Sequence, residues 1–272
     1  MTTYLEKALE LHFPPLAIYY AQQLPDGCRL TSPMCSMILI AQAAKGQTVA
    51  LSKDSCRCHG AASGFGLDAL HPENFPGGTE CFLRFLSIGN SGWEYGQGVI
   101  AQLKEAGAPK ILIEEFSDGE GFCKTPELVQ DWVDSLPEIR SEGPFVIISP
   151  LENVQEGNRP KVVSLLVNAD QLSALVVLAN YARKGSDHVR IPFGAGCYCF
   201  GFYAFVQAEE ENPGAIIGLT DISARYYLHK TLGKDILSFT VPLSMFEEIE
   251  ANAPESFLVK YAWKTMMKKN QT

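Results

Sequence analysis

The sequence predicts an α/β fold of the mixed α+β kind, in which helices and strands share one compact unit. Apolar runs with strand character alternate with apolar runs of helical spacing. Residues 16–20, LAIYY, have the composition of a buried strand. Residues 36–45 and 170–184 are long apolar helical runs, and a glycine follows each of them, as is common at helix ends. These observations predict one compact domain spanning residues 1–272.

Local patterns predict the other elements in chain order. Residues 4–12 have helical spacing, and Pro14 and Pro15 end this first helix. Thr125 is a suitable N-cap with a proline after it, so a helix is expected to begin there. Short strands are expected at residues 48–51, 110–116, 145–149, 162–167, 189–193, 215–219 and 236–241. A loop is expected over 52–66, a helix over 93–106 and a helix-rich tail from residue 243.

Two segments of the chain are similar to each other. Residues 35–47 and 174–186 are both apolar helical runs that end in Ala-x-Lys-Gly, and the same spacing aligns Cys58 with Cys197. We therefore expect two pseudo-symmetric halves, residues 1–150 and 151–272, whose cysteine-bearing loops meet. Chance similarity between two common αβ units is the alternative.

The charge balance restricts the classes of partner. The 272 residues include 22 Lys and Arg against 31 Asp and Glu, and the net charge of −9 repels phosphate backbones and acidic membrane surfaces. No apolar run reaches the roughly 18 residues that span a bilayer, and the N-terminus lacks the pattern of a secretory signal. We expect a cytoplasmic protein that binds a small molecule or a redox partner protein, and neither nucleic acid nor membrane.

Five of the eight cysteines form the candidate site. Cys56 and Cys58 are one Cys-x-Cys pair and Cys197 and Cys199 are another, and both pairs lie near glycines. In a strand, residues i and i+2 face the same side, so two sulfurs could reach one ion. Cys35 opens the first long helical run, where the helix dipole favours a thiolate. In a reducing compartment such thiols indicate metal or redox chemistry rather than disulfides.

Three functions are compatible with these thiols. The first is an iron–sulfur protein for electron transfer or for cluster-assisted chemistry on a small molecule. Four of the five cysteines would then hold a [4Fe–4S] cluster: Cys35, Cys58 and Cys197, with either Cys56 or Cys199 as the fourth ligand. The second is an enzyme without a cluster, in which His59 or Arg57 lowers the pKa of a nucleophilic Cys58. The third is a non-catalytic module that binds a small molecule or zinc between the two halves.

Other residues carry weaker signals. Arg225 follows the strand expected at 215–219 and is a candidate for binding an anion, with a structural ion pair as the alternative. The glycine-rich segments 64–66 and 194–196 match neither a dinucleotide-binding fingerprint nor a phosphate-binding loop. The three remaining cysteines fit the usual role of small buried hydrophobes. They are Cys28, Cys81 and Cys123.

The order of several short motifs resembles that of a known family. The motifs are Pro15-Leu16-Ala17-Ile18-Tyr19, Pro33-Met34-Cys35, Cys58-His59-Gly60-Ala61, Lys161-Val162-Val163, Gly194-Ala195-Gly196-Cys197 and Asp221-Ile222-Ser223-Ala224-Arg225. From about Pro14 to Val241 the chain resembles the uncharacterised family named domain of unknown function 169. In the family's pattern Cys35, Cys58 and Cys197 are the matching cysteines. The resemblance implies a shared architecture and implies no particular activity.

Overall fold

The computed structural model describes residues 3–33, 35–67, 73 and 75–269. The mixed α/β fold class is confirmed. The chain divides into two compact units, one formed by residues 1–68 and 139–272 and the other by residues 69–138. The predicted single domain, with halves meeting at residue 150, stays a prediction.

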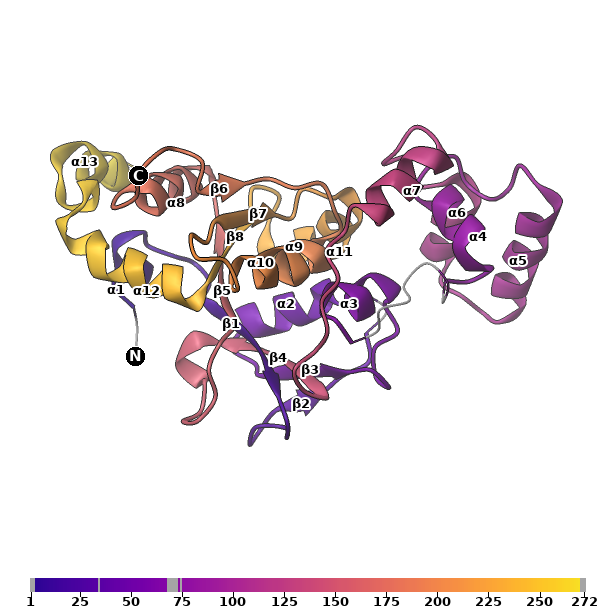
Figure 1. The fold of residues 1–272 in the computed structure, drawn as a ribbon, viewed down its shortest axis with the longest axis horizontal. Helices are drawn as coiled ribbons and strands as arrows, with labels where there is room; N and C mark the ends of the chain where they lie inside the picture. Colours follow the sequence, from indigo (N-terminus) through magenta and orange to yellow (C-terminus); the bar gives the residue numbers. More distant parts are fainter. Residues whose placement is uncertain (1–2, 34, 68–72, 74, 270–272) are drawn as a thin grey trace. The chain divides into compact units, whose positions relative to one another are not determined.

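An eight-stranded sheet forms the centre of the larger unit (Figure 1). Its strands are β1 (Leu16–Ala21), β2 (Arg29–Leu30), β3 (Val49–Ser52), β4 (Phe145–Pro150), β5 (Val162–Val167), β6 (Val189–Arg190), β7 (Ala215–Gly218) and β8 (Leu237–Pro242). Their order across the sheet is β2-β3-β4-β1-β5-β8-β7-β6. Neighbours are antiparallel except for the parallel outer pairs β2–β3 and β6–β7.

The sheet consists of two groups of four strands with the same order and the same directions. β1 to β4 form one group and β5 to β8 the other, and β1 and β5 pair antiparallel at the centre. This correspondence equates α2 (Met37–Ala44), between β2 and β3, with α9 (Gly196–Phe200), between β6 and β7. The similar segments 35–47 and 174–186 do not follow it, because residue 174 lies in α8 (Ala169–Asn180), between β5 and β6. The sequence repeat itself stays a prediction.

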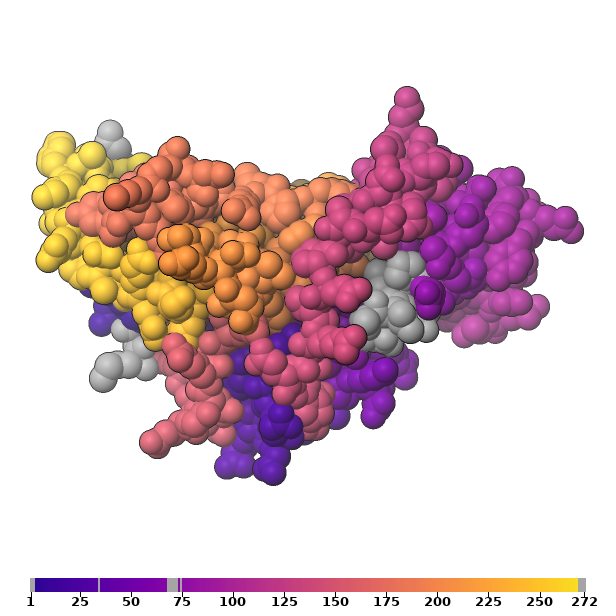
Figure 2. Space-filling model, viewed as in Figure 1, coloured from indigo at the N-terminus to yellow at the C-terminus, as the bar shows by residue number. Residues whose placement is uncertain are grey.

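Helices cover both faces of this sheet. On one face α1 (Tyr4–Ala8), α8 and α12 (Leu243–Asn252) contribute to a core with Leu165 and Phe239 of the sheet. Figure 2 shows the C-terminal segment beside α8 on the surface of this unit, in agreement with the contact between α8 and α12. α2, α9 and α10 (Phe202–Gln207) lie on the other face, where alternate strand residues point.

The rest of the larger unit consists of short helices and turns. α3 (His59–Gly64) lies within residues 52–66, where the sequence predicts a loop, and α11 (Ile222–Leu232) follows β7. The helix-rich tail is confirmed by α12 and α13 (Tyr261–Lys269). Three 3₁₀ turns complete this unit: η1 (Leu151–Asn153), η2 (Ala253–Glu255) and η3 (Phe257–Val259).

The smaller unit is helical in its described residues, with α4 (Gly78–Phe85), α5 (Glu94–Glu105), α6 (Lys110–Asp118) and α7 (Pro126–Asp134). Thr125 caps α7 as the sequence predicts, and its hydroxyl accepts a hydrogen bond from the Leu128 N–H at 3.4 Å. The predicted strand at 110–116 is wrong. Its isoleucines favour a strand, but Ile113 and Phe116 lie three residues apart and join the helical core of this unit. Every helix in the described part of the chain is too short or too polar to span a membrane.

Candidate functional site

The candidate site lies where helices from the two groups of strands begin. α3 packs against α9, and α2 packs against α11, so each contact joins one helix of each group. Cys58, at the N-cap of α3, follows β3, and Asp221, at the N-cap of α11, follows β7. Cys197 is the second residue of α9. The pairing of α3 with α9 brings Cys58 beside Cys197, as the sequence predicts for these two residues.

Glycines allow α3 and α9 to approach each other closely. A Cβ atom at Gly64 would lie 2.9 Å from the carbonyl oxygen of Cys197, and one at Gly201 would lie 2.0 Å from the carbonyl oxygen of Gly64. A Cβ at Gly60 would lie 3.2 Å from the Sγ atom of Cys197. Larger side chains at Gly64 and Gly201 would therefore push the two helices apart, since backbone atoms are in the way.

Cys58 is a half-buried residue whose sulfur several donors stabilise as a thiolate. Its sulfur accepts a hydrogen bond from the thiol of Cys197, and the backbone N–H groups of Ser36, Ala61 and Gly60 also donate to it. The hydrogen bond from Cys197 is the largest cause, and together these donors outweigh burial and lower the pKa of Cys58 to about 6. At neutral pH Cys58 is therefore mainly a thiolate.

Cys197 is the protonated member of the pair. It is buried, with 4% of its surface exposed. The hydrogen bond to Cys58 and burial raise the pKa of Cys197 well above its usual value, and the negative charges of Cys58, Cys35 and Asp221 act in the same direction. The two sulfurs thus share one proton, which resides on Cys197.

The remaining cysteines of the predicted site lie in other surroundings. Cys35 directly precedes Ser36, the N-cap of α2. The thiol of Cys56 donates to the carbonyl oxygen of Cys58 at 3.3 Å, and burial raises the pKa of Cys56 to about 11. Burial, followed by the charge of Asp221, raises the pKa of Cys199 to about 12. Cys56 and Cys199 are therefore protonated at neutral pH, unlike Cys58.

The strand geometry expected for the Cys-x-Cys pairs is absent at both, since Cys56 and Cys58 lie between β3 and α3, with Cys58 as the N-cap of α3. Cys197 and Cys199 lie in α9, where residues i and i+2 differ in direction by about 200° around the helix axis. Cys199 accordingly faces the sheet, where a Cβ at Gly218 would lie 3.3 Å from its sulfur. The described ranges contain no group of three or more His, Cys, Asp or Glu side chains that could hold a metal ion. The [4Fe–4S] cluster and zinc stay predictions.

A family model matches most of the chain. The model of the family named domain of unknown function 169, described as "Uncharacterised ArCR, COG2043", matches residues 4–252. The chain belongs to this family. The resemblance drawn from the order of motifs is thereby confirmed, although Met34 of the Pro33-Met34-Cys35 motif lies outside the described residues. No curated protein and no solved structure matches the chain.

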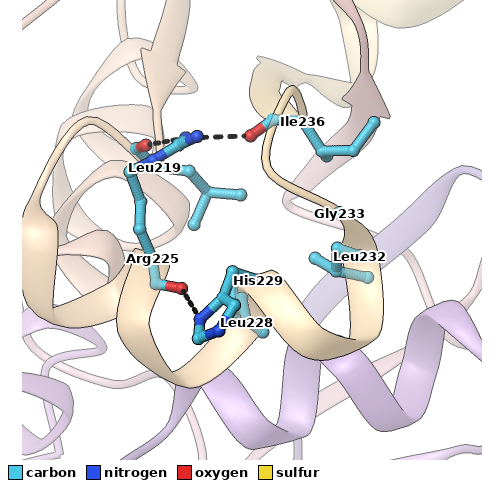
Figure 3. Close-up of a pocket in the computed structure, with 7 residues that line it drawn as sticks. All are labelled: Leu219, Arg225, Leu228, His229, Leu232, Gly233 and Ile236. Carbon is cyan, nitrogen blue, oxygen red and sulfur yellow. Dashed lines mark hydrogen bonds between the residues drawn. The ribbon is translucent and has the colours of Figure 1, made fainter.

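Arg225, which lies in one of the motifs that resemble the domain of unknown function 169 family, has a structural role. Its guanidinium donates to the carbonyl oxygens of Leu219 and Ile236, both at 3.1 Å, and to that of Lys234. Figure 3 shows the hydrogen bonds to Leu219 and Ile236 at a small pocket between α11 and the segment before β8. Arg225 thus ties the end of β7 to the start of β8 through backbone carbonyls, while anion binding by Arg225 stays a prediction.

The structure also shows site residues that the sequence patterns do not single out. The main donors to Cys58 are Cys197 and three backbone N–H groups, rather than the predicted His59 or Arg57. Tyr198 is buried beside the thiol pair, and its hydroxyl lies 3.2 Å from Ser63 Oγ. Backbone donors have no signature in the residue types, because any residue except proline provides an N–H group.

Proposed function

We propose that this member of the domain of unknown function 169 family is a thiol–disulfide redox enzyme in which Cys58 attacks the substrate and Cys197 resolves the intermediate. The observation that supports this proposal is the hydrogen bond between the two thiol groups, at the contact of α3 with α9. Residue Cys58 is half-buried and Cys197 is buried next to it, which suits an attacking and a resolving cysteine respectively.

The proposed reaction transfers two electrons. The Cys58 thiolate attacks one sulfur of a small-molecule disulfide, the substrate S–S bond breaks, and one thiolate leaves. Cys197 then gives up its proton to the departing thiolate and attacks the Cys58 sulfur. The second half of the substrate leaves as a thiolate, which takes a proton from water, and a Cys58–Cys197 disulfide forms. A redox partner protein or a small thiol would reduce this disulfide again.

The order of the two steps follows from the proton on Cys197. While Cys58 is a thiolate, its hydrogen bond and its charge keep Cys197 protonated and unreactive. The mixed disulfide removes that charge, so the pKa of Cys197 falls and the resolving thiolate forms next to its target. A cytoplasmic location belongs to the same proposal, because a reducing compartment keeps the cysteine pair ready to react.

Oxidised glutathione provides the test of this function. The reduced wild-type chain should form a Cys58–Cys197 disulfide and release two glutathione molecules per chain, as measured by peptide mass spectrometry. The Cys197→Ser variant should stop at glutathione bound to Cys58. Cys199→Ser, in the same helix, is the matched control and should behave as the wild type. A wild-type chain that keeps glutathione on Cys58, or that leaves Cys58 unmodified, would rule out the resolving role of Cys197.

An iron–sulfur protein is the second candidate. The negative charges of Cys58 and Cys35 both act on Cys197. The three cysteines that match the family pattern therefore influence one another, as thiols that share a cluster would. Iron, zinc and acid-labile sulfide would be measured per chain after purification without oxygen. Iron matched by sulfide, together with broad absorbance near ~400 nm, would support a thiolate-ligated cluster. A colourless protein without iron after reconstitution would leave the thiol chemistry as the function.

A further inference from the structure

Asp221 occupies the position in the second group of strands that Cys58 occupies in the first. Cys58 follows β3 and is the N-cap of α3, and Asp221 follows β7 and is the N-cap of α11. Each side chain faces an N–H group of its own helix, from Ala61 or Ala224 respectively. Each also faces an N–H group at the beginning of another helix from its own group of strands.

That second donor is Ser36 for Cys58 and Gly196 for Asp221. Ser36 is the N-cap of α2, and Gly196 is the first residue of α9. Because the strand order equates α2 with α9, the two contacts are equivalent in the fold. Gly196 is also the residue directly before Cys197, so the carboxylate of Asp221 acts on the backbone that carries the resolving thiol.

The packing around Gly196 leaves little freedom at this point. A Cβ atom there would lie 2.6 Å from Met37 Sδ of α2 and 3.1 Å from the Cβ of Ala224 of α11. The beginning of α9 therefore fits closely between α2 and α11. A shift of α11 would move the neighbouring Cys197 relative to Cys58.

The helix cap uses only one of the two oxygens of Asp221. Asp221 Oδ2 accepts the hydrogen bond from the Ala224 N–H at 3.1 Å, which an asparagine or serine would accept equally well. The buried Oδ1 atom has no hydrogen-bond partner of ordinary geometry within the described residues. A buried acceptor without such a partner lowers stability, so its presence beside the thiols favours a functional role.

We propose that Asp221 is a positioning residue for Cys197: its carboxylate holds the beginning of α9 against α11, and thereby sets the resolving thiol at its place beside Cys58. The kinetic part of this inference rests on the proposed function. The structural part concerns only Asp221, Gly196 and Ala224, and amide hydrogen exchange at Gly196 tests it independently of the proposed function.

The test compares Asp221→Ala with Asp221→Asn in the full-length protein. Alanine removes both acceptor oxygens, whereas asparagine keeps one. Asp235→Ala is the matched control, since Asp235 is exposed in the segment after α11. Amide hydrogen exchange in the peptide that contains Gly196 is measured first. With oxidised glutathione, the rate of adduct formation on Cys58 and the rate of closure by Cys197 are then measured separately.

Asp221→Ala is expected to raise exchange at Gly196 and to slow closure by about tenfold, the scale of one lost hydrogen bond. Adduct formation on Cys58 should stay within about twofold, and Asp221→Asn should restore exchange and closure to within about threefold. Unchanged exchange and closure in Asp221→Ala would overturn the inference, and so would an asparagine variant that folds but restores neither. If the wild type forms no Cys58–Cys197 disulfide, the proposed function fails, while exchange at Gly196 still decides the positioning role.

Discussion

The thiol of Cys197 donates a hydrogen bond to the thiolate of Cys58, and this single contact shifts the pKa values of the two residues in opposite directions. Cys58 belongs to the beginning of α3 and Cys197 to α9, which follow different groups of strands in the sheet. The contact therefore depends on how the two groups come together. Changes that separate α3 from α9 should affect the chemistry of both residues.

The free energy of unfolding should depend on pH through this pair. Between about pH 6 and 8.5 the unfolded chain holds two protons on these cysteines and the folded chain holds one, so stability should rise with pH. Above about pH 8.5 the folded chain keeps the Cys197 proton that the unfolded chain loses, so stability should fall.

Urea unfolding at a series of pH values measures this effect. The double variant Cys58→Ala/Cys197→Ala removes both groups, and its values are subtracted from those of the wild type. The difference should pass through a maximum near pH ~8.5. A difference that is constant between about pH 6 and 8.5 would mean that Cys58 keeps its proton in the folded chain.

Gly60→Ala should disturb the thiol pair with little effect on stability. The new Cβ would lie 3.2 Å from Cys197 Sγ, so the thiol must move, while the backbone N–H that donates to Cys58 is kept. Alanine in a helix contributes up to about 1 kcal/mol relative to glycine, which offsets part of the strain. Slower closure of the Cys58–Cys197 disulfide with nearly unchanged urea unfolding is the expected result.

The matched control for this variant is Gly98→Ala. Gly98 lies in α5, and a Cβ there would have no atom within 4 Å, so only the helix propensity changes. Closure at the wild-type rate in Gly60→Ala would show that the Cys197 thiol can move aside without strain. That result would contradict the close packing of α3 against α9.

Gly201→Ala should destabilise the protein strongly. A Cβ at this position would lie 2.0 Å from the Gly64 carbonyl oxygen and 2.7 Å from that of Cys197, and backbone atoms cannot rotate away as side chains can. Overpacking of this kind costs about 1–3 kcal/mol or more. Thermal unfolding measures the loss, and Gly92→Ala is the control because a Cβ at Gly92 would have no atom within 4 Å. An unfolding temperature equal to that of the wild type would show that α3 and α9 lie farther apart.

The regular elements could be predicted wherever local pattern and packing agree. The LAIYY run forms β1, buried in the centre of the sheet, and Thr125 caps α7. A strand at residues 110–116 is predicted wrongly because isoleucine favours strands. In the structure these side chains pack into the helical core of the smaller unit instead. The segment around Cys197 is also rich in residues that favour strands, yet it forms α9, which packs on α3 where Gly64 allows a close approach.

The site could be predicted only in part for a similar reason. Scarce, reactive cysteines identify Cys58 and Cys197 from the sequence, and the idea of two related halves places them together. The correspondence between the halves is different, however, since the strand order equates Cys58 with Asp221 by position. Strand pairing between distant segments and backbone N–H donors decide the geometry, and neither can be read from residue types alone.

The most direct test of the central claim is the pKa of Cys58, measured from the rate of its alkylation by iodoacetamide at a series of pH values. Peptide mass spectrometry follows Cys58 separately from the other cysteines, and Cys199→Ala is the control. The wild type and the control should both show a midpoint at about pH 6, the pKa that the hydrogen bond from Cys197 and the N–H groups produce. Cys197→Ala should raise the midpoint, because the largest of these contributions is lost. A wild-type midpoint near the usual value of about 8.5, or one that Cys197→Ala leaves unchanged, would contradict the account.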